Sequence, residues 1–182
     1  MKVAITGHTS GLGSEFARCL EQRNHTVQGF SRSNGYDLRN WTIMQKMLAE
    51  INDVDMLISC AKPDYTQSVL LYEAFKLWVG MPKIILNVSS ILTYYPDMPE
   101  TLRSDPMMYF YKNTKTSLNR ACAELSSLGQ YPKIMLVKPG HLYSNPISDS
   151  EQKKLTTWVE FLLNIIEQAH SLGFNIKEIT LD

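Results

Sequence analysis

The sequence lacks an excess of charge of either sign, because its 18 Lys and Arg residues are balanced by 18 Asp and Glu residues. A neutral chain has no electrostatic reason to bind nucleic acid or an anionic membrane surface. The sequence also lacks any apolar run of the ~20 residues that a membrane-spanning helix needs. We therefore expect neither nucleic acid nor a membrane among the partners of this protein.

Cysteine is scarce as well. Cys19, Cys60 and Cys122 are odd in number and far apart, and the sequence contains no CxxC pair and no Cys/His cluster. This pattern argues against a disulfide framework and offers no zinc-ligand spacing, so we expect no metal site. The first residues, MKVAITGHTSGLG, lead into a strand and a glycine-rich turn rather than a signal peptide. We expect a cytoplasmic protein.

What is present is a regular alternation of two kinds of segment. Of the 182 residues, 44% are hydrophobic, which suits one domain over residues 1–182. Short apolar runs predict strands at 2–5, 26–30, 55–60, 83–88, 133–137 and 176–181. Helical periodicity predicts helices at about 12–22, 40–52, 65–80, 107–128 and 149–171. This alternation predicts an α/β fold, a single Rossmann-type doubly wound parallel sheet of about six to seven strands with helices on both faces.

A glycine-rich segment, TGHTSGLG, lies between the first predicted strand and the first predicted helix, from Thr6 to Gly13. Gly7, Gly11 and Gly13 permit a tight turn and let a diphosphate approach the amino end of the helix. Free N–H groups and the helix dipole favour anions there. A plain glycine-rich turn is the alternative interpretation. The position at the carboxyl end of a strand favours nucleotide binding.

The stretch PMMYFYKNTKTSLNR, residues 106–120, contains two tyrosines and two lysines. Residues four apart on a helix share a face. Tyr111 and Lys115 have this spacing, whereas Tyr109 has Asn113 at that position and Lys112 only three residues on. A lysine one turn away favours a phenolate, so it should lower the pKa of Tyr111 from its ordinary value of about 10. The pair predicts an acid/base group; a surface helix pair is the alternative, and Tyr109 is expected to pack or to form a pocket wall.

Two further segments follow predicted strands: NVSS (Asn87–Ser90) and KPGHLYS (Lys138–Ser144). Together with TGHTSGLG and YKNTK, and in this order, they resemble the landmarks of the short-chain dehydrogenase/reductase (SDR) superfamily. The family has a glycine-rich turn, a catalytic serine, a Tyr-x-x-x-Lys motif and a Pro-Gly turn at these places. The resemblance extends over nearly the whole chain. It implies hydride transfer between a nicotinamide cofactor and a small carbonyl or alcohol substrate.

The resemblance also implies roles for individual residues. Ser90 would hydrogen-bond the substrate oxygen, Tyr111 would be the general acid/base, and Lys115 would also hold the nicotinamide ribose. Ser89 should point to the opposite face of its strand. The implied cofactor contacts are Thr6, Gly7, Thr9, Ser10, Gly11, Leu12, Gly13, Ser31, Arg32, Asp37, Leu38, Cys60, Ala61, Lys62, Tyr111, Lys115, Pro139, Gly140, Leu142 and Ser144.

The cofactor preference is predicted by the end of the second strand, which reads FSRSNGYDL. Relatives that prefer NAD usually carry an acidic residue there, to bind the ribose hydroxyls. This chain has Ser31 and Arg32, and a guanidinium pairs well with a 2′-phosphate. We therefore expect NADP(H) rather than NAD(H). Asp37 and Leu38 resemble the family's pair beside the adenine ring, but only a short loop precedes them, so the family's crossover helix is expected to be absent.

The sequence departs from the family at several points. The family's Asn-Asn-Ala-Gly stretch is replaced by Ser59-Cys60-Ala61-Lys62, in which Cys60 is either a reactive thiol or, as we expect, a small buried residue. The family's catalytic asparagine has no evident match, although Asp64 and Gln67 lie nearby. Two hypotheses follow. The protein is an NADP(H)-dependent oxidoreductase, or it is a catalytically weak or inactive NADP(H)-binding regulatory or scaffolding protein on the same fold.

Two surfaces are also predicted. In relatives, the helices at about 65–80 and 107–128 pair with their two-fold copies, so we expect a homo-oligomer, a dimer or tetramer. The stretch SVLLYEAFKLWV supports this, because it has more apolar positions than one buried stripe needs. The segment before Tyr111 is expected to form a wall of the substrate pocket, with Tyr94, Tyr95, Met98 and Met107 either lining it or packing the loop.

Overall fold

A computed structural model describes residues 1–61, 64–140 and 148–181 of the chain. Within them, six strands form one sheet in the order β2-β1-β3-β4-β5-β6, and all neighbouring strands are parallel. The strands are β1 (Lys2–Thr6), β2 (Thr26–Phe30), β3 (Met56–Ser59), β4 (Ile84–Val88), β5 (Lys133–Pro139) and β6 (Glu178–Leu181). The predicted parallel α/β fold is confirmed.

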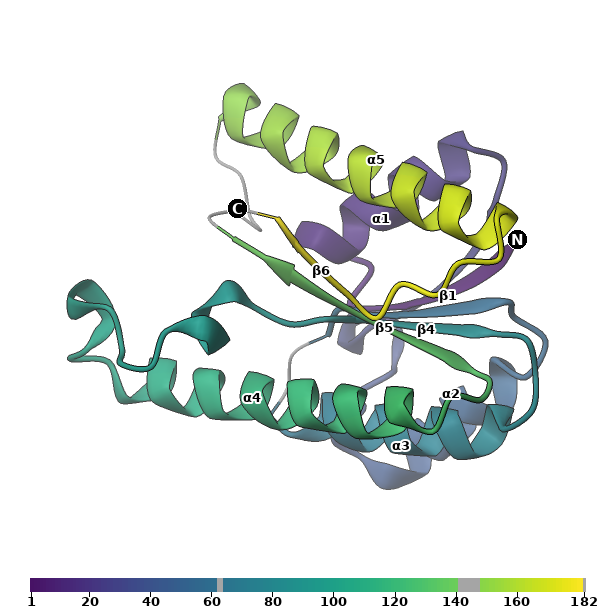
Figure 1. Cartoon of the computed structure of the whole chain (residues 1–182), viewed down its shortest axis with the longest axis horizontal. Helices are drawn as coiled ribbons and strands as arrows, with labels where there is room; N and C mark the ends of the chain where they lie inside the picture. The colour runs from purple at the N-terminus through teal and green to yellow at the C-terminus, as the bar shows by residue number, and fades with distance from the viewer. Residues whose placement is uncertain (62–63, 141–147, 182) are drawn as a thin grey trace.

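Helices cover both faces of the sheet, as predicted (Figure 1). One face carries α1 (Gly11–Gln22) and α5 (Asp149–Ser171), and the other carries α2 (Trp41–Glu50), α3 (Thr66–Trp78) and α4 (Pro106–Ser127). Alternate strand residues supply the two cores. In β1, Val3 and Ile5 pack on the side of α1 and α5, whereas Ala4 packs on the side of α2, α3 and α4. Helix boundaries lie within two residues of those predicted from periodicity.

Helix starts follow local hydrogen-bonding chemistry. The Asp105 carboxylate accepts a bond of 2.8 Å from the Met107 N–H, and Pro106 fills the first position of α4. A proline there loses no helical hydrogen bond, and an aspartate is a strong N-cap. Asn40 caps α2 in the same manner, accepting from the Thr42 N–H at 2.9 Å. These caps place Tyr111 and Lys115 in the first half of α4.

The connection after β2 is short, as predicted. A 3₁₀ turn, η1 (Arg32–Asn34), leads through Asp37 to α2, and α2 leads directly to β3. Consequently β2 forms an edge of the sheet. In the sheet, β2 lies on one side of β1, and β3, the next strand along the chain, lies on its other side. The topological switch point is therefore between β1 and β3. Ligands of such sheets bind at the carboxyl ends of the strands beside that point.

The segment between β4 and α4 extends beyond the body of the domain together with the first turns of α4 (Figure 1, left). It contains two 3₁₀ turns, η2 (Ile91–Tyr94) and η3 (Glu100–Leu102). The Lys112 ammonium donates to the backbone carbonyls of Tyr95 and Pro96, so α4 itself holds this segment. No helix in the described part of the chain is both long and apolar enough to cross a membrane.

Candidate active site

A cleft of about 900 Å³ opens across the carboxyl ends of the strands. Most of the cofactor and catalytic residues predicted from the sequence line it together: Gly7, Thr9, Ser10, Gly11, Leu12, Gly13, Ser31, Arg32, Asp37, Leu38, Cys60, Ala61, Ser90, Tyr111, Lys115, Pro139 and Gly140. Three predicted residues, Lys62, Leu142 and Ser144, lie outside the described residues. Segments distant in the sequence therefore converge on one cleft.

The glycine-rich turn forms one wall of the cleft. Gly7 has a φ of 72°, and a Cβ on Gly13 would lie 2.1 Å from the Gly7 carbonyl oxygen. Only glycine at position 13 permits this close approach. Ser10 is the N-cap of α1, but its side chain makes no capping bond. The N–H groups of the first turn of α1 therefore have no capping side chain and are suited to an anion.

Thr6 does not line the cleft, contrary to prediction. It is fully buried, and its hydroxyl oxygen accepts bonds from the backbone N–H groups of Cys60 and Ala61, each at 3.1 Å. Thr6 therefore connects the end of β1 to the segment that follows β3. It supports the cleft wall rather than forming it.

Aromatic and apolar side chains line the end of the cleft next to β2. Phe30 and Tyr36 pack edge-to-face with ring centroids 4.8 Å apart, and Leu38 is buried beside the core. The Asp37 carboxylate accepts two bonds from the Arg39 guanidinium, at 2.9 and 2.5 Å. These bonds lower the pKa of Asp37 to about 2. This end offers apolar surface to a flat ring system and a carboxylate that stays charged.

Two guanidinium groups and two hydroxyls line the same end. Arg32 was predicted, whereas Arg39 and Ser33 were not. The Ser31 and Ser33 hydroxyl oxygens lie 2.8 Å apart at the 3₁₀ turn η1. Arg39 could have been found from its position two residues after Asp37, because the loop that carries Asp37 into the cleft also carries its neighbours.

Ser90 and Tyr111 meet at the other end of the cleft. Their side chains are hydrogen-bonded, and Ser90 Oγ also accepts from the Leu92 N–H at 3.2 Å. Burial raises the pKa of Tyr111 above its usual value, and the bond with Ser90 offsets part of that rise. The expectation that Lys115 lowers this pKa is therefore wrong, because burial and Ser90 decide the shift and the Lys115 ammonium lies 5.7 Å from the centre of the Tyr111 ring.

Lys115 is 3% exposed and points toward the sheet. Its ammonium donates to the Val88 carbonyl and to Gln67 Oε1, both at 2.7 Å. Gln67 lies in the first turn of α3, and its place in the sequence indicates only that it lies near the site. A contact between side chains of two different helices cannot be predicted from residue spacing. Of the two neighbours noted above, Asp64 lines the cleft but Gln67 contacts the lysine.

A chain of hydrogen bonds fixes the backbone that carries Ser90. The Ser89 hydroxyl donates to Asn119 Oδ1 at 2.5 Å, so Ser89 contacts α4 like Ser90, and the expectation that it points to the opposite face is wrong. Asn119 donates to the Thr93 hydroxyl at 2.8 Å, and Thr93 donates to the Ser90 carbonyl at 2.9 Å. Positioned in this way, Ser90 presents its hydroxyl to Tyr111.

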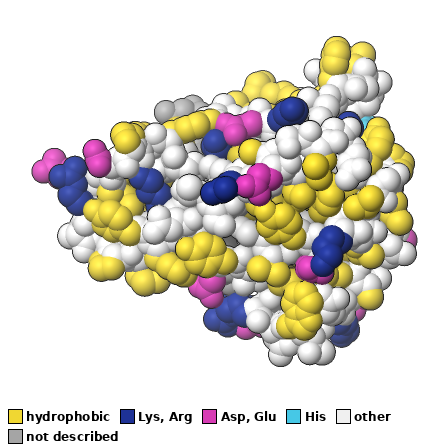
Figure 2. Space-filling view, turned by 60° about the horizontal axis from the view of Figure 1, so that its bottom comes forward, with side chains coloured by type: hydrophobic (Ala, Val, Ile, Leu, Met, Phe, Trp, Pro, Cys, Tyr) yellow, Lys and Arg dark blue, Asp and Glu magenta, His cyan; other side chains and the backbone are white. Residues whose placement is uncertain are grey.

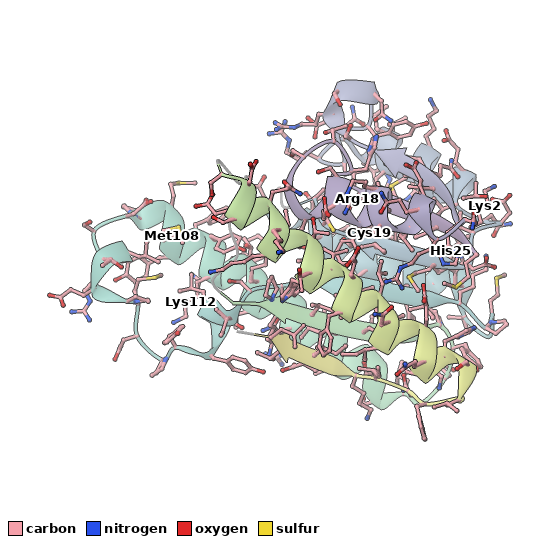
Figure 3. The ribbon with its side chains drawn as sticks, turned by 90° about the horizontal axis from the view of Figure 1, so that it is seen from above. Lys2, Arg18, Cys19, His25, Met108 and Lys112 are labelled. Carbon is pink, nitrogen blue, oxygen red and sulfur yellow. The ribbon has the colours of Figure 1, made fainter. Side chains whose placement is uncertain are left out.

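Of the two alternatives for the segment before Tyr111, packing rather than lining the cleft describes Tyr94 and Met98. Tyr94 donates to Glu178, and the Lys138 ammonium lies 4.0 Å from the centre of its ring, so Tyr94 packs on the edge of the sheet. Met98 is buried, and Met108 lines the cleft instead. Figure 3 shows Met108 and Lys112 at the projecting end of α4.

Cys60 lines the cleft and is partly buried. Burial raises the pKa of the Cys60 thiol to about 12, which keeps it protonated, as expected of a packed cysteine. Tyr109 is exposed and does not line the cleft. In the described ranges, no group of three His, Cys, Asp or Glu side chains could hold a metal ion.

The sheet order and the cleft define a Rossmann-type α/β domain. No protein-family model and no curated protein matches the sequence, but many solved structures match the fold. A small-chain dehydrogenase in complex with NADPH aligns with a TM-score of 0.75 and 15% identity over 100% of this chain and 96% of that one. A short-chain dehydrogenase/reductase from Vibrio parahaemolyticus gives 0.71 and 17% over 98% of both chains.

A third structure, the 3-alpha-hydroxysteroid dehydrogenase from Pseudomonas sp. B-0831 complexed with NADH, gives a TM-score of 0.67 and 19% identity over 100% of this chain and 95% of that one. At these identities the likeness establishes the fold alone. The chain therefore shares its fold with these dehydrogenases, and its chemistry rests on its own side chains.

Proposed function

We propose that this protein is an SDR-type oxidoreductase that transfers a hydride between NADP(H) and a small carbonyl or alcohol substrate. The observation that carries this proposal is the hydrogen-bonded pair of Ser90 and Tyr111 in the same cleft as the glycine-rich turn. Lys115 follows one helical turn after the tyrosine, also on the cleft. A dinucleotide lying from α1 to Tyr111 would bring its reactive ring to these hydroxyls.

The bound nicotinamide would supply or accept the hydride. In carbonyl reduction, the Tyr111 hydroxyl donates its proton to the substrate oxygen, and the Ser90 hydroxyl hydrogen-bonds that oxygen as negative charge develops. Because the pKa of Tyr111 is raised above its usual value, its hydroxyl is protonated at neutral pH. This state suits the proton donor of carbonyl reduction.

The preference for NADP(H) is proposed on the charge of the cleft next to β2. Arg32 and Arg39 offer guanidinium groups, and Ser31 and Ser33 offer hydroxyl donors. A 2′-phosphate would pair with these groups, whereas NAD(H) has no charge at this place. Asp37 is already paired with Arg39, so it does not cancel the charge of Arg32 by direct contact.

The proposed function is tested in two steps. NADPH and NADH are titrated into the purified protein, and NADPH oxidation is then followed over a panel of aldehydes and ketones. Binding of NADPH together with oxidation dependent on one carbonyl would support the enzyme. Binding without any turnover across the panel would favour the regulatory or scaffolding alternative. Lack of binding of either cofactor would contradict both.

Two further proposals concern the whole protein. We infer that it self-associates, because Val69 and Tyr72 of α3 and Tyr65 just before this helix are exposed, with the spacing of one helix face. We also propose a reducing compartment such as the cytoplasm, because Cys19, Cys60 and Cys122 are all free thiols.

A further inference from the structure

Gln67 occupies an unusual place for a long polar side chain. It is 4% exposed, at the start of α3, and its side chain reaches the ends of two neighbouring strands. Its Nε2 donates to the carbonyl of Ser59 at the end of β3, at 2.7 Å, and to the carbonyl of Val88 at the end of β4, at 3.1 Å. Its Oε1 accepts from the Lys115 ammonium at 2.7 Å. One side chain thus connects β3, β4, α3 and α4.

The chemistry of the neighbours fixes the orientation of the Gln67 amide. Carbonyl oxygens accept hydrogen bonds but cannot donate, so only the NH₂ group of Gln67 can face Ser59 and Val88. The amide oxygen is thereby directed to Lys115, which can only donate. Rotation of the amide by half a turn would place oxygen against oxygen and nitrogen against ammonium. The amide is therefore held in a single orientation that presents an acceptor to the lysine.

Lys115 needs such an acceptor because it is buried. An ammonium removed from water is stabilised when it donates to polar groups and is destabilised when it does not. Gln67 Oε1 and the Val88 carbonyl are neutral acceptors, so they hold the ammonium in place without neutralising its charge. Lys115 and Tyr111 both line the cleft, so a ligand there would lie beside this ammonium.

We propose that Gln67 is a positioning residue that holds Lys115 in its charged form and directs it toward the cleft. The consequence for cofactor binding rests on the proposed function, whereas the consequence for the lysine itself does not. Glutamate at this position would face two carbonyl oxygens, and asparagine would be one methylene too short for all three bonds. Only an amide of this length makes all three bonds.

The first test observes the lysine without any cofactor or substrate. Side-chain ammonium signals of ¹⁵N-lysine-labelled protein are recorded by NMR, and Lys115 is assigned by its loss in Lys115→Met. We expect a signal protected from solvent exchange that disappears in Gln67→Met, which keeps the chain length but forms none of these bonds. The matched control is Gln152→Met on α5, whose amide contacts Glu15 away from the cleft. A Lys115 signal that is unchanged in Gln67→Met would overturn the proposal.

The second test measures NADPH affinity against pH, in a Tyr111→Phe background that removes the titration of the phenol. Among the described residues, the thiols of Cys60 and Cys122 also interact with the Lys115 charge, and burial raises the pKa of each to about 12. Loss of a bond to a charged group should weaken binding on the order of tenfold in Gln67→Met. It should also move the alkaline loss of affinity to lower pH, because the ammonium releases its proton more readily.

Gln67→Glu serves if Gln67→Met does not fold. Its carboxylate still accepts from Lys115, so the ammonium signal should persist and the alkaline loss of affinity should move to higher pH. An unchanged pH profile in both variants would overturn the proposal. If the wild type does not bind NADPH but the Lys115 signal still depends on Gln67, the proposed function fails and the positioning role stands.

Discussion

Two tyrosines on α4, two residues apart, have opposite surroundings. Tyr111 is largely buried, lines the cleft and is hydrogen-bonded to Ser90, whereas Tyr109 is 42% exposed and lies off the cleft. The helical rotation between them, about 200° for two residues, produces this difference. The chemistry of α4 should therefore depend on one phenol and not on the other.

Tyr111→Phe should reduce turnover on the order of 10²–10⁴-fold, because it removes the proton donor. Only a hydroxyl is lost, so folding and NADPH affinity should change little. Steady-state kinetics with a carbonyl substrate found in the panel, together with NADPH titration, measure both effects. Tyr109→Phe is the matched control and should remain within a few-fold of the wild type. Wild-type turnover in Tyr111→Phe would refute the acid/base assignment.

Arg32→Ala should weaken NADPH binding by roughly ten- to a hundredfold, since charge-assisted bonds to a phosphate contribute about 1.5–3 kcal/mol. NADH affinity should stay nearly constant, because NADH lacks the 2′-phosphate. Isothermal titration of both cofactors into the wild type and the variant separates the two effects. Arg39→Ala should have a smaller selective effect, because Arg39 is shared with Asp37. Equal affinities of NADPH and NADH in the wild type would exclude the preference.

For single residues, short-range spacing in the sequence predicted which side chains reach the cleft. Contacts between distant segments could not be predicted from it. The four-residue interval brought Tyr111 and Lys115 to the same cleft, and the strand-end rule placed Ser90 there. Gln67 could not be assigned, because its three bonds join segments separated by 8 to 48 residues. The raised pKa of Tyr111 was also missed, since spacing reports a nearby lysine but not the burial of the phenol.

Among the elements, α3 has a face whose apolar side chains are exposed. Its buried side holds Leu70, Leu71 and Trp78, but Val69 and Tyr72 are 41% and 39% exposed. Figure 2, which brings the side of α3 and α4 forward, shows apolar side chains spread over this face between charged ones. An apolar helix face of this kind is typical of an interface with another copy.

Val69→Glu should therefore dissociate the oligomer, because a carboxylate would be buried in the contact between copies. Light scattering at micromolar concentration should give a multiple of the monomer mass for the wild type and the monomer mass for the variant. Phe161→Glu on α5 is the control, since Phe161 is also exposed, at 51%, but lies on the other side of the sheet. A wild type that is already monomeric would contradict self-association.

Element boundaries and order were predictable because apolar periodicity depends on local sequence. The runs 83–88 and 133–137 became adjacent strands β4 and β5, with Ile84 opposite Lys133. The path of the segment before α4 was not predictable. Tyr94 contacts Lys138 and Glu178 at the sheet edge and does not face the substrate. Lys138 and Glu178 form an ion pair between distant segments, which no local sequence pattern predicts.

In the molecule as a whole, many elements of a short chain together line one cleft. The glycine-rich turn after β1, the loop after β2, the ends of β3, β4 and β5, and α4 all line it. The edge position of β2 does not interrupt this arrangement, because the loop with Asp37 and Arg39 still closes that end. A ligand in the cleft would touch nearly every segment that connects a strand to the next helix.

This arrangement predicts that NADPH stabilises the whole domain and not one loop. At a concentration of 100 times its Kd, a ligand that binds only the folded state adds about 2.7 kcal/mol to the free energy of unfolding. For a domain of this size, that corresponds to a rise in Tm of roughly 5–10 °C. Differential scanning calorimetry should show one cooperative transition that moves with NADPH. At equal concentration, NADH should move it less, and Arg32→Ala should bring the two cofactors together. A transition that NADPH leaves in place, in a protein that unfolds cooperatively, would mean that the cleft does not bind the dinucleotide.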